Sequence, residues 1–330
     1  MKAAIFRRYG PPEVLKVEEV PKPIPQEGQI LVRNKATAVT AADYRIRGAN
    51  FPKGMGLFAK LYMGNPKPRK SIQILGGGFS GVVESVGKNV HHFKKGDQVL
   101  GMRTPPNMGT YAEFLVIDEN SAVTIKPKSI SHQDAAGMVF GGTTALYFLH
   151  DLGRLKKGET ILINGASGAV GTNAVQLAKY YGAKVTAVCS TKNVKLVKSL
   201  GADKVIDYTK TDISRAGTFD VVFTSAPGLD TDGLIALSKP NGRVLLVLAD
   251  LMGMLKAKLP FLRKNSSNSI QFIDGIAPER KEDINFLVGL MEKKKLKVVI
   301  DKEYSLDDIA EAHRYADTGH KAGNLVINIG

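Results

Sequence analysis

The stretch Asn164-Gly165-Ala166-Ser167-Gly168-Ala169-Val170-Gly171 decides the fold of this 330-residue chain. It follows an apolar run at residues 160–163 and precedes residues 170–181, where apolar side chains recur at helical spacing. A strand, a glycine turn and a helix in this order are typical of pyrophosphate binding, because small residues let the backbone approach the phosphates and helix-terminal amides meet their charge. We therefore predict that a dinucleotide binds at Ala166, Ser167, Gly168, Ala169, Val170 and Gly171. A purely structural glycine turn is the alternative.

Outward from this turn, apolar strands alternate with helical patterns. Such alternation is typical of parallel βαβ units and predicts a doubly wound parallel sheet. Strands are expected at residues 160–163, 184–188, 204–206, 219–224, 243–248 and 269–273, and helices at residues 170–181, 193–200 and 279–292.

The first 125 residues or so have a different texture. Short alternating or β-branched stretches are separated by Gly and Pro clusters, which predicts an irregular antiparallel β unit. Residues 48–70 form either a long loop or a short buried helix. A helix near residues 306–315 and a strand at residues 324–327 close the chain.

Composition excludes several classes of protein. A single cysteine, Cys189, excludes an internal disulfide scaffold, and 43% hydrophobic residues indicate a folded globular chain. The amino terminus has no apolar leader and no uncharged run is long enough to span a bilayer, so we expect a cytoplasmic protein without membrane insertion. The net charge of +15 favours a polyanion: nucleic acid, an acidic membrane face or a phosphorylated cofactor. Local basic runs, such as Lys67, Arg69 and Lys70, are interpreted as solvated loops and helix ends.

The end of the second predicted strand indicates which dinucleotide binds. A site for NAD typically has Asp or Glu there to hold the ribose 2′-hydroxyl. This chain has hydroxyls and a cation instead, which suit a 2′-phosphate and predict NADPH. The residues are Ser190, Thr191 and Lys192, with Lys195 and Tyr208 as additional contacts. Alternatively, Ser190 merely caps the next helix.

Several segments resemble the medium-chain dehydrogenase/reductase superfamily, in its zinc-free quinone oxidoreductase and enone reductase branch. The matching segments are GGGFSGVVESVGKNVHHFKK (76–95), GDQVLG (96–101), GTYAE (109–113) and GGTTAL (141–146), together with residues 164–179 and 200–208. The resemblance implies a GroES-like β-rich catalytic domain at residues 1–122 and 295–330, with an inserted Rossmann domain at residues 123–294. It also implies a homodimer formed through the edge strand near residues 269–273.

The resemblance adds further cofactor contacts. Thr143 and Thr144 match a position near the nicotinamide half of the cofactor, and Asn324 matches a carboxy-terminal position that reaches it. Ala226 and Ala249 end successive predicted strands, where a doubly wound sheet places its ligand crevice.

Departures from the zinc-dependent members indicate the chemistry. Thr40, Gly77 and Gly78 stand where those enzymes have their zinc ligands, and residues 102–108 lack the cysteines of their structural lobe, so we expect no metal. Alcohol oxidation then lacks its Lewis acid, whereas reduction of a quinone or an α,β-unsaturated carbonyl needs hydride placement and one hydrogen-bond donor. Tyr44 is the first candidate for that donor, although packing in the core explains it equally well.

We therefore predict an NADPH-dependent, zinc-independent reductase of quinones or α,β-unsaturated carbonyls. Two alternatives remain open at this stage. One is a reductase of simple carbonyls. The other is a dinucleotide-binding protein with weak catalysis, whose basic surface binds nucleic acid or an acidic membrane. Nucleic acid is disfavoured, because no aromatic residues interleave with the basic ones to form a stacking platform.

Overall fold

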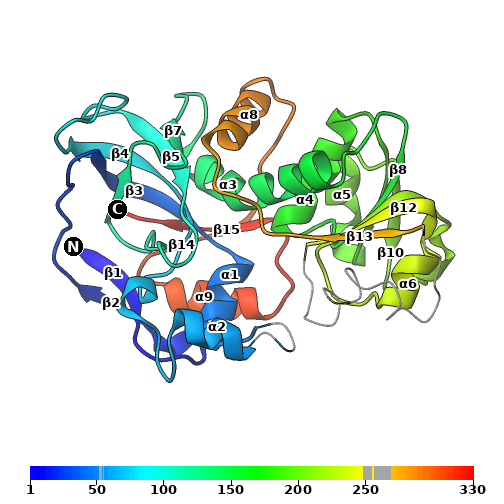
Figure 1. Cartoon of the computed structure of the whole chain (residues 1–330), viewed down its shortest axis with the longest axis horizontal. Coiled ribbons are helices and arrows are strands. Elements are labelled where there is room, and N and C mark those ends of the chain that lie inside the picture. Colours follow the sequence, from blue (N-terminus) through cyan, green and yellow to red (C-terminus); the bar gives the residue numbers. More distant parts are fainter. Residues whose placement is uncertain (52–53, 55, 248–254, 256–268) are drawn as a thin grey trace.

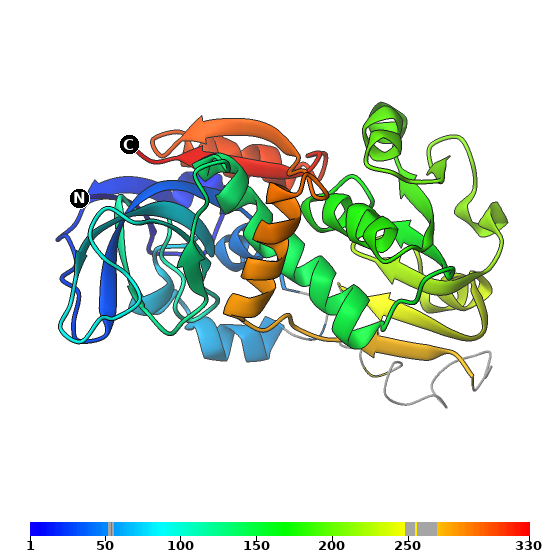
Figure 2. The ribbon, with the colours of Figure 1, turned by 90° about the horizontal axis from the view of Figure 1, so that it is seen from above.

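A six-stranded and a seven-stranded β-sheet lie side by side in the computed structural model, and both chain termini lie on the side of the seven-stranded sheet (Figure 1). The structure describes residues 1–51, 54, 56–247, 255 and 269–330. Seen from above, α3 (His132–Leu146) and α8 (Lys281–Glu292) lie between the two sheets (Figure 2).

The first sheet is parallel and has six strands in the order β10-β9-β8-β11-β12-β13. The order reverses direction between β8 and β11, so the prediction of a doubly wound sheet is confirmed. Ile161, Ile163 and Val222 are fully buried, as expected for strands covered on both faces. The strands are β8 (Thr160–Asn164), β9 (Lys184–Cys189), β10 (Lys204–Asp207), β11 (Phe219–Thr224), β12 (Ser238–Leu246) and β13 (Gln271–Asp274).

The helices of this half include one that the sequence patterns do not reveal. Helix α3 continues into a π-helical turn, Tyr147–Leu152, and contributes fully buried side chains such as Ala135 and Met138 to the largest core cluster. Its glycines and threonines have low helix propensity, so tertiary packing rather than propensity stabilises it. The remaining helices are α4 (Ala169–Tyr180), α5 (Val194–Ser199) and α6 (Thr231–Ala236), with short 3₁₀ turns at Thr191–Asn193 and Ile213–Ala216.

The second sheet has the order β14-β15-β3-β4-β5-β7, and β6 also pairs with β3. All of its pairings are antiparallel except β14 with β15, which confirms the expected antiparallel β unit. The carboxy-terminal strand β15 pairs with β3, so the end of the chain returns to the first unit. The domain bounds of 1–122 with 295–330 and 123–294 stay a prediction. The strands are β3 (Gln29–Val39), β4 (Gly78–Val86), β5 (Gln98–Met102), β6 (Phe114–Asp118), β7 (Val123–Ile125), β14 (Ile300–Ser305) and β15 (Asn324–Asn328).

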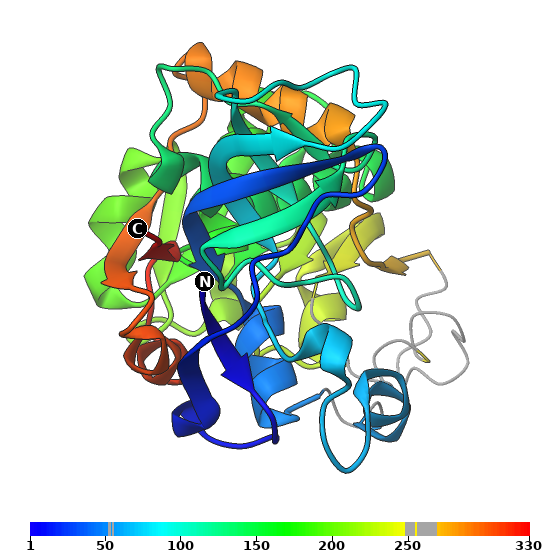
Figure 3. The same ribbon diagram turned by 90° about the vertical axis from the view of Figure 1, so that its left-hand side faces the viewer.

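Below this sheet lies a hairpin of β1 (Lys2–Phe6) and β2 (Leu15–Glu19), with α2 (Gly56–Met63) beside it (Figure 3). The stretch at residues 48–70 therefore contains a short helix, but the expectation that it is buried is wrong, because Leu61 and Tyr62 are exposed. Helices α1 (Ala41–Gly48) and α9 (Ile309–Asp317) and 3₁₀ turns at Pro12–Val14 and Lys70–Ile72 complete this half. Among the helices described, we find none with the length and apolar character that crossing a bilayer requires.

Candidate functional site

The glycine turn joins β8 to α4, and its three glycines have different physical roles. Gly165 has a positive φ of +81°, and an added Cβ would lie 2.8 Å from the Cβ of Ala226. A Cβ on Gly171 would lie 2.1 Å from the carbonyl oxygen of Gly165, so this glycine lets α4 pack against the turn. At Gly168 the nearest atom to an added Cβ is 3.6 Å away. The packing of the protein itself therefore does not require glycine at position 168.

The open space at Gly168 fits a dinucleotide phosphate. Gly168 is the N-cap of the 12-residue helix α4, and no side chain in the described part of the chain caps the first amides of this helix. Its first turn carries no acidic residue either. Unpaired amide groups at a helix start attract an anion, so residues Ser167 to Val170 have the geometry to hold a pyrophosphate.

The residues after β9 lie beside this turn. The Lys192 ammonium donates a hydrogen bond to the carbonyl oxygen of His320 (2.8 Å), which places it close to the carboxy-terminal segment. The Thr191 hydroxyl donates to a carboxylate oxygen of Asp207 (2.6 Å) and is therefore already engaged within the protein. The single hydrogen of the Thr191 hydroxyl is thus taken, whereas the Lys192 ammonium keeps two further hydrogens that it can donate to a ligand phosphate.

Asn193 connects the two parts of the candidate cofactor site, and the sequence patterns did not reveal it. Its side-chain amide donates to the Ser167 hydroxyl (3.0 Å) and, more weakly, to the Ser190 hydroxyl (3.5 Å). The contact joins the glycine turn to the end of β9. The only sequence signal was its position three residues after Ser190.

Asp207 was also missed, because it ends β10 rather than β9. It pairs across the sheet with Cys189. Hydrogen bonds from the Thr191 and Thr209 hydroxyls lower the pKa of its carboxyl, so it is anionic at neutral pH. A carboxylate therefore stands next to the predicted 2′-phosphate site.

The carboxy-terminal segment crosses over the glycine turn. The Gly323 amide donates to the Ser167 carbonyl oxygen (2.7 Å), and the next residue, Asn324, is buried with its side-chain amide donating to Val299 (3.0 Å). Lys321, another residue that the sequence patterns missed, donates to the Gly323 carbonyl oxygen (2.7 Å). Burial lowers the pKa of Lys321 to about 8, so this segment brings a desolvated amine close to the turn.

Helix α3 packs against the start of α4. A Cβ on Gly141 would lie 2.5 Å from the Ala169 carbonyl oxygen, so the two backbones approach closely. Thr143 is buried and donates its hydroxyl to the Val139 carbonyl oxygen (2.7 Å). Thr144 lies three residues after Gly141, on the same helix face. Helix α3 thus approaches the start of α4 at Gly141, and the cofactor contacts of Thr143 and Thr144 stay a prediction.

The structure places the other predicted contacts at different distances from the turn. Ala226 lies directly over it and accepts hydrogen bonds from the side chains of Asn164 (3.1 Å) and Thr224 (3.0 Å). Lys195 and Tyr208 lie exposed at the edge of this region, in α5 and just after β10. Ala249 lies outside the described residues.

In the half of the molecule that contains the seven-stranded sheet, Asp43 joins two separate segments. One of its carboxylate oxygens accepts the Thr40 amide (2.7 Å) and hydroxyl (2.6 Å), and the other accepts the Gly76 amide (2.8 Å). Asp43 is fully buried, and burial raises the pKa of its carboxyl. The start of α1 is thereby tied to the glycines that precede and begin β4.

Tyr111 extends this buried cluster to α9. Its hydroxyl lies 3.2 Å from a ring nitrogen of His313, and burial raises the pKa of Tyr111 well above its usual value. Arg47 lies close by and forms an ion pair with Asp317 (2.7 Å). The cluster joins residues far apart in the sequence, so no local pattern indicated it.

Tyr44 follows Asp43 and is half-buried against the hydrophobic cluster that includes Val39 and Ile46. Its hydroxyl makes no hydrogen bond with any residue that the structure describes. Tyr44 is therefore available as a donor, and its role stays a prediction.

Arg103 lies beside the same glycines, and we had not singled it out. Its amide donates to the Gly77 carbonyl oxygen (2.9 Å), and its guanidinium lies 3.7 Å from the Cβ position of Gly109. Burial lowers the pKa of Arg103, and within the described ranges its side chain has no hydrogen bond or ion pair. The sequence signal for it is a single basic residue in the cysteine-free segment 102–108.

No group of three or more His, Cys, Asp or Glu side chains in the described part of the chain is arranged to hold a metal ion. Thr40, Gly77 and Gly78 occupy the positions where the resemblance places zinc ligands, and none of the three has a ligating side chain of that kind. Cys189 is buried, and burial raises the pKa of its thiol to about 11.

A doubly wound sheet with an open glycine cradle, joined to an antiparallel β unit, defines a two-sheet dinucleotide-binding protein. Residues 26–128 match the family described as alcohol dehydrogenase GroES-like domain, and residues 200–327 match the one described as zinc-binding dehydrogenase. The chain belongs to the medium-chain dehydrogenase/reductase superfamily, in its quinone oxidoreductase branch, and is an oxidoreductase. The expected GroES-like domain is thereby confirmed.

Individual relatives cover nearly the whole chain. Quinone-oxidoreductase QR1, chloroplastic, from Triphysaria versicolor is 33% identical over 99% of this chain and 98% of its own length. The 2-methylene-furan-3-one reductase of Solanum lycopersicum is 32% identical over 99% of this chain and 79% of its own length. The crystal structure of Escherichia coli quinone oxidoreductase complexed with NADPH is 25% identical, with a TM-score of 0.82 over 99% of this chain and 100% of that one.

Proposed function

We propose that this chain is an NADPH-dependent, zinc-independent reductase of quinones or α,β-unsaturated carbonyls, with the substrate held between the two sheets. The observation that carries the proposal is the open cradle at Gly168, which lies beside Ser190 and Lys192 through the Asn193 bridge. The names of two relatives, a quinone oxidoreductase and a furanone reductase, support the substrate class. A bound nicotinamide would supply hydride.

The residues of the chain divide the remaining tasks. The first amides of α4 would hold the pyrophosphate, and Ser190 and Lys192 would bind the 2′-phosphate. Lys192 would exchange its present acceptor, the His320 carbonyl, for the phosphate. The E. coli structure named as an NADPH complex supports this preference.

Arg103 and Tyr44 are the proposed donors to the substrate oxygen. Negative charge develops on the carbonyl oxygen of a quinone or enone as it is reduced, and a preorganised donor stabilises that charge. Arg103 is a desolvated cation whose side chain makes no hydrogen bond or ion pair with any described residue, although the charge of Glu279 acts on it. Because a guanidinium does not release its proton, the proton would come from the Tyr44 hydroxyl or from water.

A cofactor titration tests the proposal first. Wild type should bind NADPH in preference to NADH, and Lys192→Ala should lose that preference. Lys198→Ala, which removes another exposed lysine from the same region, is the matched control and should keep it. If neither cofactor binds, the glycine turn is structural and the proposal is wrong.

Product analysis tests the chemistry. An enone should yield the saturated ketone, whereas an allylic alcohol would indicate a reductase of simple carbonyls. Activity that depends on added zinc and disappears with a chelator would contradict zinc independence. Arg103→Leu should lower kcat more than Arg103→Lys, because only the lysine keeps a cation near Gly77.

We also propose a homodimer that pairs through β13, the strand that ends the order of the six-stranded sheet. This pairing is the one that the resemblance to the family implies. Light scattering should give twice the mass of one chain, and a monomeric mass would refute the pairing. The cytoplasmic location stays a prediction.

A further inference from the structure

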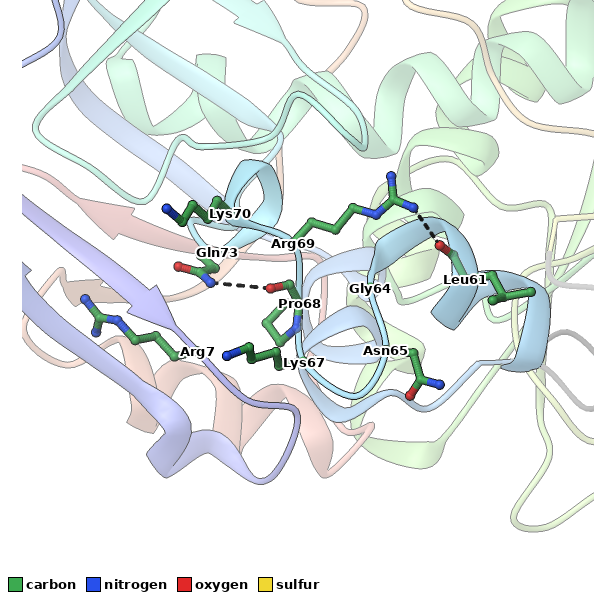
Figure 4. Close-up of a pocket in the computed structure, with 9 residues that line it drawn as sticks. All are labelled: Arg7, Leu61, Gly64, Asn65, Lys67, Pro68, Arg69, Lys70 and Gln73. Atoms are coloured by element: carbon green, nitrogen blue, oxygen red, sulfur yellow. Dashed lines mark hydrogen bonds between the residues drawn. The ribbon is translucent and has the colours of Figure 1, made fainter.

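The basic run at Lys67, Arg69 and Lys70 follows α2 and ends at the first residue of the 3₁₀ turn Lys70–Ile72. The proposed reaction does not use this segment. The fold brings Arg7, just after β1, next to this segment. Together with Gln73 these residues line a cavity of about 760 Å³, here called the basic cup (Figure 4). The elements next to the basic cup, β1 and α2, lie far from β8 and α4, which carry the cofactor cradle (Figure 1).

The wall of the basic cup is held in place by hydrogen bonds. Gly64 has a positive φ of +114°, and a Cβ there would lie 2.4 Å from the Lys67 carbonyl oxygen, so the segment folds back tightly on itself. The Arg69 amide donates to the Met63 carbonyl oxygen (2.8 Å), and the Tyr9 hydroxyl donates to the Gly64 carbonyl oxygen (2.8 Å). The lysines of the run therefore project from a fixed backbone rather than from a loose solvated loop.

The lining of the basic cup contains four cations and no carboxylate. The Arg7 guanidinium forms an ion pair with Glu18. Arg69 points to the opposite side of the segment, where its guanidinium donates to the Leu61 carbonyl oxygen (2.9 Å). Lys67 and Lys70 project to the same side as Arg7 (Figure 4). Neither lysine has an ion pair or hydrogen bond from its ammonium group within the described residues. Like charges that share a cavity repel one another, so an anion bound between them is stabilised.

We propose that the basic cup binds the phosphate group of a second ligand, distinct from the dinucleotide. Phosphate is a compact, multiply charged anion that suits lysine ammonium groups as point charges. The volume falls within the range of small-molecule sites and leaves room for the rest of the ligand. Leu61 (58% exposed) and the neighbouring Tyr62 (53% exposed) offer that remainder an apolar rim. The phosphate belongs either to a free phosphomonoester or to a lipid headgroup.

Two sets of measurements at low salt test this site. Inorganic phosphate is titrated into wild type, into Lys67→Gln/Lys70→Gln, and into Lys94→Gln/Lys95→Gln, a control that loses the same charge from another exposed lysine pair. Wild type and control should bind phosphate, and the cup variant should bind it roughly tenfold more weakly, as expected for loss of charge-assisted hydrogen bonds. All three proteins should have the same melting temperature and the same NADPH affinity.

Vesicles of phosphatidylcholine with and without phosphatidic acid identify the source of the phosphate. Sedimentation of wild type and control, but not of the cup variant, with phosphatidic acid vesicles would assign the site to a lipid headgroup. Phosphate binding without vesicle binding would assign it to a free phosphomonoester. The proposal is overturned if wild type binds neither probe, or if the cup variant binds both as well as the control does. Because NADPH is measured separately, failure here leaves the proposed reductase function untouched.

Discussion

The two halves of this molecule build their sites in opposite ways. The cofactor cradle comes from consecutive residues around Gly168, in a tight turn in which Gly165 has a positive φ. The buried cluster around Asp43 is instead assembled from separated segments. Asp43 accepts a hydrogen bond from the Gly76 amide, 33 positions later, and Tyr111 contacts His313, 202 positions later. A local motif is therefore visible in sequence, whereas a site made by tertiary contacts is visible only when the chain is folded.

The sharpest test of the cofactor cradle compares two glycines that lie three residues apart. Gly171→Ala should destabilise the protein by about 3 kcal/mol or more, because its Cβ would lie 2.1 Å from the Gly165 carbonyl oxygen. Gly168→Ala should change stability by less than about 1 kcal/mol but weaken NADPH binding, because its Cβ projects into open space. Thermal unfolding without cofactor and a cofactor titration measure the two effects. Equal loss of stability in both variants would contradict the roles assigned here.

For the buried cluster around Asp43, Asp43→Asn is the corresponding test. The asparagine amide would face N–H donors of Thr40 or Gly76, so we expect a loss of about 2 kcal/mol in unfolding free energy, together with a lower kcat. Asp307→Asn is the control, since that carboxylate is exposed and meets only Lys2, at 3.5 Å, among the described residues. An Asp43→Asn protein as stable and active as the control would show that the two segments do not depend on this carboxylate.

Acid should first destabilise the half of the molecule that contains the seven-stranded sheet. Burial lowers the pKa of His313 to about 3, helped by nearby Arg47, and burial lowers the pKa of His132 to about 4. An unfolded histidine binds its proton at about pH 6.5, so between pH 6.5 and 4 the unfolded chain holds more protons than the folded one. As the pH is lowered through this range, the free energy of unfolding should therefore decrease by roughly 1.4 kcal/mol per pH unit for each histidine.

Urea unfolding at pH 7, 6 and 5 measures this slope, and His132→Asn should make it shallower. Amide exchange at pH 5 should open β3 and β4 before β8 and β11, because His132 bonds to Ser80 of β4 (2.8 Å) and His313 lies on α9. Stability that stays constant from pH 7 to pH 5 would show that neither histidine is held neutral in the folded protein.

The smallest expected effect lies at the edge of the cofactor site. Asp207→Asn removes the carboxylate next to Thr191, so NADPH should bind a few-fold more tightly while NADH affinity stays the same. Isothermal titration with both cofactors, at low and at high salt, measures the change, and salt should reduce it. Identical gains for both cofactors would place the 2′-phosphate away from Asp207.

Prediction from sequence succeeded where periodicity was clear. The strand at residues 219–224 matches β11, and the helix expected at residues 170–181 matches α4 within one residue at either end. Helix α3 was missed, because its glycines and threonines give a weak helical signal that packing against α4 overrides. Among site residues, Asn193, Asp207 and Arg103 were missed for a related reason, since each contacts a neighbour from another strand or segment. Lys321 was missed because only burial in the folded chain distinguishes it from other lysines.

By itself, the sequence determined the parallel sheet, the glycine cradle and the family, because these depend on side-chain period and on residues that are adjacent in the chain. Only the tertiary structure decided which groups meet at that cradle: the Gly323 amide on Ser167, the Lys192 ammonium on His320, and the carboxylate of Asp207 beside Thr191. It also gathered Arg7 and Lys67 into one basic cup. Contacts of this kind depend on how distant segments pack together, and local sequence patterns carry no information about that packing.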